Sequence, residues 1–227
     1  MYKAVIFDFD GLILDTETLH VEIYQEMFRD HERDFPYSEW IQNIGSKSKF
    51  SIFDLLDREL TTEKVDRELW KVQNQQKFSE RVSTLEARPG VIEYLNAAKA
   101  EGLRIGLASS STNKWVTSHL KNLNLIDFFE TIRTSDDVEF VKPDPALYRL
   151  AVEDLGLSPS ECLAFEDSAN GAIAAVEAGL TCVLVPNHTT KHLEFPNVKQ
   201  RLDSMNDVPF YQLLKELKLS FDKENSE

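Results

Sequence analysis

The stretch Ala4-Val5-Ile6-Phe7-Asp8-Phe9-Asp10-Gly11 decides the fold, because an apolar run ends abruptly in two acids and a glycine. The apolar run predicts a buried strand that leads into a turn. In an extended strand, residues i and i+2 point the same way, so Asp8 and Asp10 are expected to face one spot at its carboxyl end. Like charges held that close repel unless a cation or a proton intervenes. We therefore expect a metal ion, a shared proton or both, with a solvated acidic turn as the alternative.

Short apolar runs recur along the rest of the chain, and helical patterns that end at glycines lie between the later ones. Strands that alternate with helices in this way predict parallel βαβ units and a sheet covered on both faces. We expect the α/β class, with a Rossmann-like doubly wound parallel sheet. The expected strands are Ala4–Phe7, 105–108, 130–133, 163–165 and 182–185, and the expected helices are Val91–Ala100, 114–123, 145–155, 170–178 and 210–217.

Residues 16–85 interrupt this alternation, because they carry helical spacing and almost no strand pattern. One long charged helix is expected over 63–83. The segment is interpreted as a helical cap domain inserted into a core formed by residues 1–15 and 86–227. Ligands of open parallel sheets bind at the carboxyl ends of the strands. An insertion that leaves from the end of the first strand is therefore expected to act as a lid over the site.

The composition is typical of a globular protein, since 42% of the 227 residues are apolar and the formal net charge is −14. This charge argues against nucleic acid and an anionic membrane surface as partners, but not against a small anionic substrate. Cys162 and Cys182 each lie in an apolar segment, where reduced thiols are expected. No apolar run of this sequence reaches membrane-spanning length, and we expect no export signal. We expect a cytoplasmic protein and a monomer.

Three further motifs follow expected strands. The hydroxyl-rich run 109–112 can donate hydrogen bonds to an anion such as phosphate, or it can simply cap the next helix. Lys142 is held ahead of a helix between valine and proline, where it can neutralise a phosphate or a nucleophile. Glu166 and Asp167 repeat the acidic strand end of Asp8 and Asp10. A cluster of oxygen ligands without histidine or cysteine selects magnesium rather than zinc.

In this order, the motifs resemble the haloacid dehalogenase-like hydrolase superfamily over nearly the whole chain. The helical insertion is similar to that of the branch with a helical cap, which includes beta-phosphoglucomutase and sugar-phosphate phosphatases. The second aspartate favours phosphoryl transfer over dehalogenation. The residues that carry the resemblance are Asp8-Phe9-Asp10-Gly11-Leu12-Ile13-Leu14-Asp15-Thr16-Glu17, Ser109, Lys142-Pro143, Glu166-Asp167-Ser168, Gly171 and Ala174-Ala175.

The resemblance implies a role for each motif. Asp8 is expected to be the nucleophile that forms an aspartyl-phosphate, and Asp10 the general acid and base. Ser109 and the backbone of Ser110 would hold the phosphoryl oxygens, and Lys142 would stabilise the charge around them. The expected cofactor is Mg²⁺. Its expected ligands are Asp8, the backbone carbonyl of Asp10, Asp167 and Glu166.

The inserted segment is expected to choose the substrate, and its residues leave two reactions open. Thr16 and His20 lie near the first junction, at positions where the resemblance implies coupling between cap closure and Asp10. In the mutase a lysine precedes the glycine of the cap loop, whereas Ile44 stands there in this chain. Lys47 or Lys49 could supply a cation to the substrate phosphate, or both could simply be solvated. We therefore expect a phosphatase acting on a small phosphorylated metabolite, with a phosphomutase and an inactive binding protein as alternatives.

Overall fold

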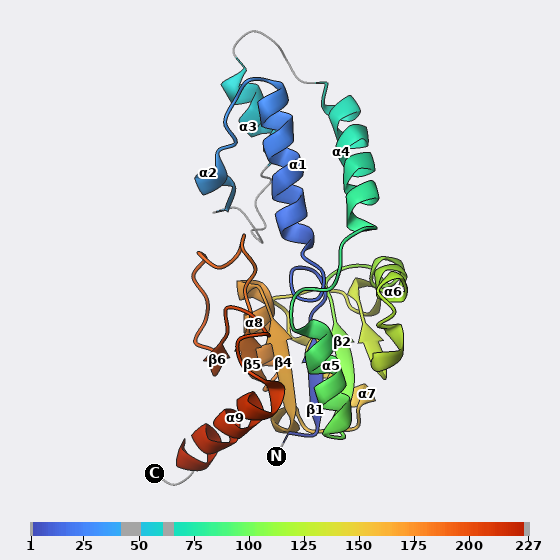
Figure 1. Ribbon diagram of the computed structural model, residues 1–227, viewed down its shortest axis with the longest axis vertical. Helices are drawn as coiled ribbons and strands as arrows, with labels where there is room; N and C mark the ends of the chain where they lie inside the picture. Colours follow the sequence, from blue (N-terminus) through green and yellow to red (C-terminus); the bar gives the residue numbers. More distant parts are fainter. Residues whose placement is uncertain (1, 42–50, 61–65, 225–227) are drawn as a thin grey trace. The chain divides into compact units, whose positions relative to one another are not determined.

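The computed structural model describes residues 2–41, 51–60 and 66–224, which form two compact units (Figure 1). The core unit contains Met1–Asp15, Glu86–Asn187 and Glu194–Glu227. The helical unit contains Thr16–Leu85 and His188–Leu193.

The core unit is built on a parallel sheet of six strands in the order β3-β2-β1-β4-β5-β6. This arrangement confirms the expected α/β class and parallel sheet. The short β6 was not expected, because a two-residue strand with a polar sequence leaves no apolar run. The strands are β1 (Ala4–Phe7), β2 (Arg104–Ala108), β3 (Thr131–Arg133), β4 (Cys162–Glu166), β5 (Thr181–Leu184) and β6 (Gln200–Arg201).

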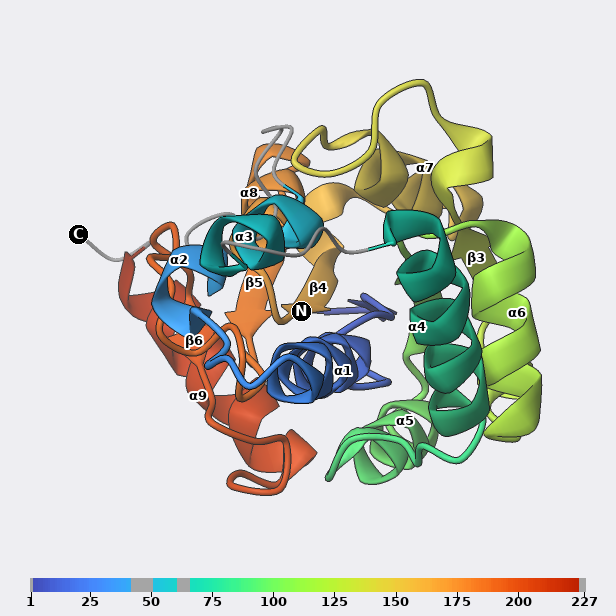
Figure 2. The same ribbon diagram turned by 90° about the horizontal axis from the view of Figure 1, so that it is seen from above.

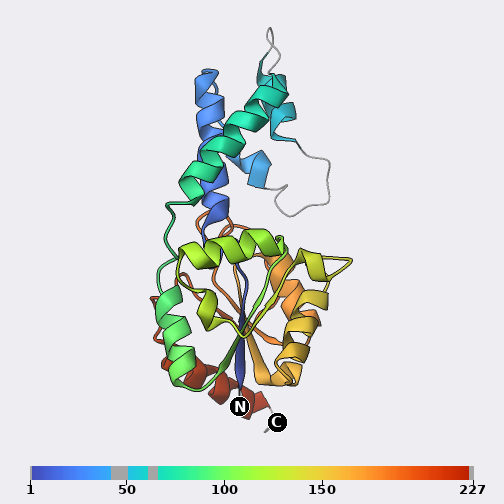
Figure 3. The same ribbon diagram turned by 90° about the vertical axis from the view of Figure 1, so that its right-hand side faces the viewer.

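Helices cover both faces of the sheet, with α5 and α9 on one face and α7 and α8 on the other (Figure 3). Their starts and ends differ from the expected ones by at most one residue, except that the last helix continues past residue 217. Among the helices of the described residues, none is both long and apolar enough to cross a membrane. The bounds are α5 (Val91–Ala100), α6 (Asn113–Asn122), α7 (Ala146–Asp154), α8 (Ala169–Glu177) and α9 (Phe210–Glu224).

Alternation along β1 sends its side chains to two different cores. Ala4 and Ile6 join a core that is formed with α7 and α8. Phe7 faces the opposite way and stacks on Phe165 of β4 at 5.0 Å between ring centroids. Phe7 and Phe165 are also partners in the β1–β4 register. The residues that follow them, Asp8 and Glu166, are therefore neighbours on the α7 and α8 side.

The helical unit comprises α1 (Thr16–Asp30), α2 (Tyr37–Ile41), α3 (Ile52–Glu59) and α4 (Arg67–Val82). Helices α1 and α4 pack against each other (Figure 2). The expected long helix starts at Arg67, where the Asp66 side chain accepts a hydrogen bond from the Leu69 amide and caps it. The apolar core of this unit contains Met27, Phe28, Ile52, Phe53, Leu55 and Leu56.

A short segment from late in the sequence, His188–Leu193, groups with the helical unit, whereas the expected core domain included it. Thr189 supplies two polar contacts with this unit. Its hydroxyl lies 3.3 Å from that of Thr18, and its carbonyl accepts a hydrogen bond from the Tyr37 hydroxyl at 3.3 Å. These polar contacts join residues far apart in the sequence, and no periodic pattern in the sequence predicts them.

Candidate active site

Lys142 is the centre of the site at the carboxyl ends of β1 and β4. Its ammonium donates to Asp8 Oδ1 at 2.5 Å, to Glu166 Oε1 at 2.6 Å and to the Ala108 carbonyl at 2.8 Å. The side chain is only 6% exposed. Burial by itself lowers the pKa of Lys142, but the two carboxylates outweigh burial and raise that pKa above its ordinary value. Lys142 therefore stays charged and joins the ends of two neighbouring strands.

Tyr148 of α7 completes the surroundings of Glu166. Its hydroxyl donates to Glu166 Oε1 at 2.6 Å, and its ring centroid lies 5.0 Å from the Lys142 ammonium. Burial, followed by the charges of Glu166 and Asp8, raises the pKa of Tyr148 well above its ordinary value. The phenol is therefore a donor throughout the physiological range.

Asp8 is buried at the end of β1, and its environment disfavours the ionised form. Burial is the largest cause, and the charge of Glu166 adds to it, whereas Lys142 opposes both. Together these groups raise the pKa of Asp8 from 3.8 to about 8. A positive charge in addition to Lys142 would favour the carboxylate form that a nucleophile requires.

The residues present fit a divalent cation. Carboxylate oxygens of Asp8, Glu166 and Asp167 lie within 4.8 Å of one another, and all three residues are buried. Lys142 pairs with Asp8 and Glu166 of this cluster. Buried acids this close together favour a bound cation, and hard oxygen ligands suit Mg²⁺. The expected metal ligands Asp8, Glu166 and Asp167 thus lie together, and Asp10 follows on the same turn.

Asp167 is fixed from two sides. Its Oδ2 accepts a hydrogen bond from the Asn187 amide, which follows β5, at 2.8 Å. Gly11 has a φ of +81°, and a Cβ built on it would lie 2.1 Å from the same oxygen. Only glycine fits a turn that is both left-handed and this close to a carboxylate. The glycine after Asp10 therefore allows Asp167 to approach the turn.

Asp10 lies on the turn beyond β1, since the strand ends at Phe7. Its Oδ2 accepts a hydrogen bond from the Ser111 hydroxyl at 2.6 Å, and its Oδ1 accepts one from the Trp115 indole at 3.0 Å. The donors to the Asp8 and Asp10 carboxylates thus come from different segments. The charge of Asp10 nevertheless adds to the causes that raise the pKa of Asp8.

The hydroxyl-rich run after β2 contains two of the expected phosphate-binding residues. Ser109 is buried, and its hydroxyl accepts a hydrogen bond from the Ser111 amide at 3.0 Å. Ser110 is exposed. Thr112 caps α6, because its hydroxyl accepts a hydrogen bond from the Trp115 amide. Helix capping, which was one interpretation of this run, therefore falls to Thr112.

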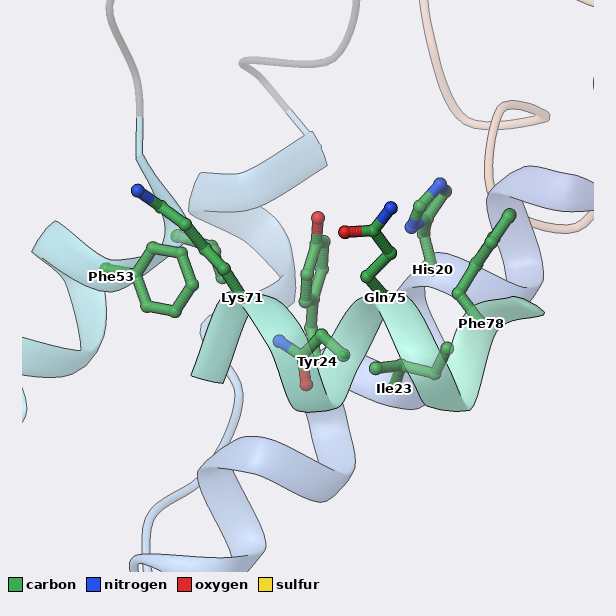
Figure 4. A pocket seen from close by; sticks show the side chains of 9 residues that line it. His20, Ile23, Tyr24, Phe53, Lys71, Gln75 and Phe78 are labelled. Atoms are coloured by element: carbon green, nitrogen blue, oxygen red, sulfur yellow. The ribbon is translucent and has the colours of Figure 1, made fainter. Parts of the chain in front are cut away.

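The other expected substrate-binding residues belong to the inserted segment. Thr16 and His20 lie on α1 of the helical unit, whereas Lys47 and Lys49 fall outside the described residues. His20 stacks on Phe78 of α4 with ring centroids 4.1 Å apart. Both residues line a pocket of about 370 Å³ within this unit, and Figure 4 shows their side chains there. Its lining residues are His20, Ile23, Tyr24, Ile52, Phe53, Lys71, Asn74, Gln75 and Phe78.

Several residues of the site were not predicted from the sequence. Asn187 follows β5, so the strand-end argument that found Glu166 would have found it too. Ser111 lies in a run already singled out for phosphate. Tyr148 and Trp115 lie inside helices, where an aromatic residue is typical of ordinary packing. No local sequence pattern distinguishes an aromatic residue that only packs from one that donates a hydrogen bond to the site.

Comparison with known proteins gives a family match to the haloacid dehalogenase-like hydrolases over residues 5–185. The chain is 51% identical to YhcW of Bacillus subtilis, whose name proposes a phosphatase, over 96% of this chain and 98% of that protein. It is 31% identical to a phosphorylated carbohydrates phosphatase of Thermotoga maritima, over 78% and 82% of the two chains. CbbY of Rhodobacter sphaeroides, solved in complex with xylulose-(1,5)bisphosphate, is 26% identical with a TM-score of 0.65 and covers 90% of this chain and 95% of its own.

Proposed function

Because the chain belongs to the haloacid dehalogenase-like hydrolase family, we propose that it is a Mg²⁺-dependent phosphatase of sugar phosphates that works through an aspartyl-phosphate. The observation that carries this proposal is the buried cluster in which Lys142 joins Asp8 to Glu166, with Asp167 beside them. The names of the relatives support the substrate class, since one is a phosphatase of phosphorylated carbohydrates and another was solved with a sugar bisphosphate.

In the first step, an oxygen of Asp8 attacks phosphorus and the bond between phosphorus and the ester oxygen breaks. The electron pair of that bond goes to the leaving oxygen, which takes a proton from Asp10. In the second step, Asp10 takes a proton from water, and the water oxygen displaces Asp8 from phosphorus. The products are the free sugar and inorganic phosphate, and both aspartates return to their initial states.

The remaining groups hold charge and position. Lys142 lies beside Asp8 and compensates negative charge that gathers on the transferring phosphoryl group. Ser109 and the backbone amide of Ser110 would donate to the phosphoryl oxygens. Asp8, Asp167, Glu166 and the Asp10 carbonyl would hold the Mg²⁺ ion, which supplies positive charge that orients the phosphate and favours ionised Asp8.

The test is phosphate release from p-nitrophenyl phosphate and from a panel of glucose 6-phosphate, fructose 6-phosphate, ribose 5-phosphate and glycerol 3-phosphate. Turnover should require Mg²⁺, stop with EDTA and fall to background in Asp8→Asn. Asp127→Asn, which changes an exposed acid of the core unit, is the matched control and should retain activity. Turnover that survives Asp8→Asn would sink the proposal.

The same preparations distinguish the phosphomutase alternative. A mutase would convert beta-glucose 1-phosphate into glucose 6-phosphate in the presence of glucose 1,6-bisphosphate. A phosphatase should instead release phosphate from the panel without forming this isomer. If glucose 6-phosphate forms, the protein is a phosphomutase and the proposed hydrolase function is wrong.

A further inference from the structure

We propose that Trp115 is a positioning residue that, together with Ser111, holds the carboxylate of Asp10 in place for proton transfer to the leaving oxygen. The inference rests on the proposed function, and it deepens that function by assigning a role to an indole side chain on α6.

The geometry around Asp10 carries the inference. The two donors bind different oxygens of the carboxylate, Trp115 Nε1 at Oδ1 and the Ser111 hydroxyl at Oδ2. An aspartate on a turn has several staggered rotamers and a broad terminal torsion. Two donors, one on each oxygen, favour a single rotamer of the Asp10 side chain. The indole nitrogen can only donate, so Trp115 cannot exchange roles with the carboxylate as a hydroxyl could.

Both donors are themselves held. The Ser111 carbonyl accepts a hydrogen bond from the Ser135 amide at 2.9 Å, and the Ser111 amide donates to the Ser109 hydroxyl at 3.0 Å. The Trp115 ring packs edge-on against His119, one helical turn later, with centroids 4.1 Å apart. A donor that is fixed before the substrate arrives loses little freedom when Asp10 reacts.

The proposal concerns one event, the transfer of the Asp10 proton to the ester oxygen as the bond between phosphorus and oxygen breaks. An alkoxide is a poor leaving group and needs this proton, whereas p-nitrophenolate leaves without much help. The ratio kcat/KM reports the steps up to release of the first product, so it isolates proton donation from the later hydrolysis of the aspartyl-phosphate.

The test compares kcat/KM for the best sugar phosphate of the panel with that for p-nitrophenyl phosphate in Trp115→Phe. Phenylalanine retains an aromatic ring beside His119 but has no N–H. We expect a loss of about tenfold or more with the sugar phosphate and a loss of less than about threefold with the aryl ester. A merely structural role would lower both values by the same factor.

Ser111→Ala is a second variant, and it tests the role of the two Asp10 donors if circular dichroism shows that Trp115→Phe does not fold. It should show the same selective loss, and Ser111→Thr, which restores a hydroxyl, should recover it. Ser118→Ala is the matched control, because it removes an exposed α6 hydroxyl that bonds the Trp115 carbonyl rather than Asp10.

The outcomes separate the inference from the proposed function. Equal losses on both substrates, or no loss, overturn the role of Trp115 if turnover still depends on Asp8. A wild-type protein without Asp8-dependent turnover overturns the proposed function and this inference together.

Discussion

Tyr148 and Lys142 donate to the same oxygen of Glu166, each at 2.6 Å. One carboxylate oxygen thus ties α7 to the lysine that reaches Asp8. Tyr148→Phe removes one donor and leaves a buried carboxylate with less compensation, which should lower the free energy of unfolding by about 1–3 kcal/mol.

Urea denaturation measures this loss. The control is Tyr211→Phe, since Tyr211 is 66% exposed and should be neutral. If the two variants have equal stability, the hydroxyl of Tyr148 contributes nothing to the cluster.

Gly171 leaves room for the second carboxylate oxygen of Glu166, Oε2. A Cβ built on this helical residue would lie 2.0 Å from Glu166 Oε2, nearer than any real contact. Alanine normally stabilises a helix relative to glycine by about 1 kcal/mol. Gly171→Ala should instead destabilise the protein and displace the carboxylate from Lys142, which thermal unfolding and kcat together report.

Gly102→Ala is the control for this substitution. Its new Cβ meets nothing within 4 Å, although φ is +72°. It should therefore cost only backbone strain, about 1–2 kcal/mol, and leave kcat unchanged. A more stable Gly171→Ala protein would contradict the close approach.

The raised pKa of Asp8 predicts how stability changes with pH in the presence of EDTA. Folded Asp8 keeps its proton up to about pH 8, whereas unfolded Asp8 loses it near 3.8. The folded chain therefore binds more protons between these values, and the contribution of Asp8 to stability falls as pH rises through this window. Asp8→Asn removes that dependence.

We expect Asp8→Asn to be more stable than the wild type at pH 8, by several kcal/mol, and close to it at pH 4. Chemical denaturation at a series of pH values measures the difference. Asp127→Asn should follow the wild-type curve at each pH. A difference for Asp8→Asn that stays constant with pH would show that Asp8 ionises normally.

Arg88 links the turn after β1 to the end of β5. Its guanidinium donates to the carbonyls of Gly11 at 2.5 Å, Val185 at 3.0 Å and Pro186 at 3.0 Å. Burial lowers its pKa, and the charge of Asp167 opposes that effect. Arg88→Met should leave three carbonyls without this donor and cost about 3 kcal/mol or more.

The matched control for Arg88→Met is Arg149→Met. Arg149 is exposed and also donates to a carbonyl, that of Glu177 at 3.2 Å. It should change stability by less than about 0.5 kcal/mol. Mg²⁺ titrated during thermal unfolding adds a second readout, because we expect Mg²⁺ to raise the unfolding temperature of the wild type and displacement of the Gly11 turn to weaken that shift.

The sequence by itself determined the class of the fold and the order of its strand-end motifs. Alternation along a strand and periodicity along a helix are local, so apolar runs and glycine stops were sufficient for β1, β4 and the helices between them. Asp8, Lys142, Glu166 and Asp167 could be singled out because each lies at or just beyond the end of an apolar run or ahead of a helix.

Only the tertiary structure decided which of these groups touch. Placing β1 between β2 and β4 puts Asp8 beside Glu166 and brings Asp10 to the segment that follows β2. Tyr148 and Trp115 became part of the site through contacts between residues about 18 and 105 positions apart. Such contacts depend on how whole elements pack, and local residue patterns do not encode them.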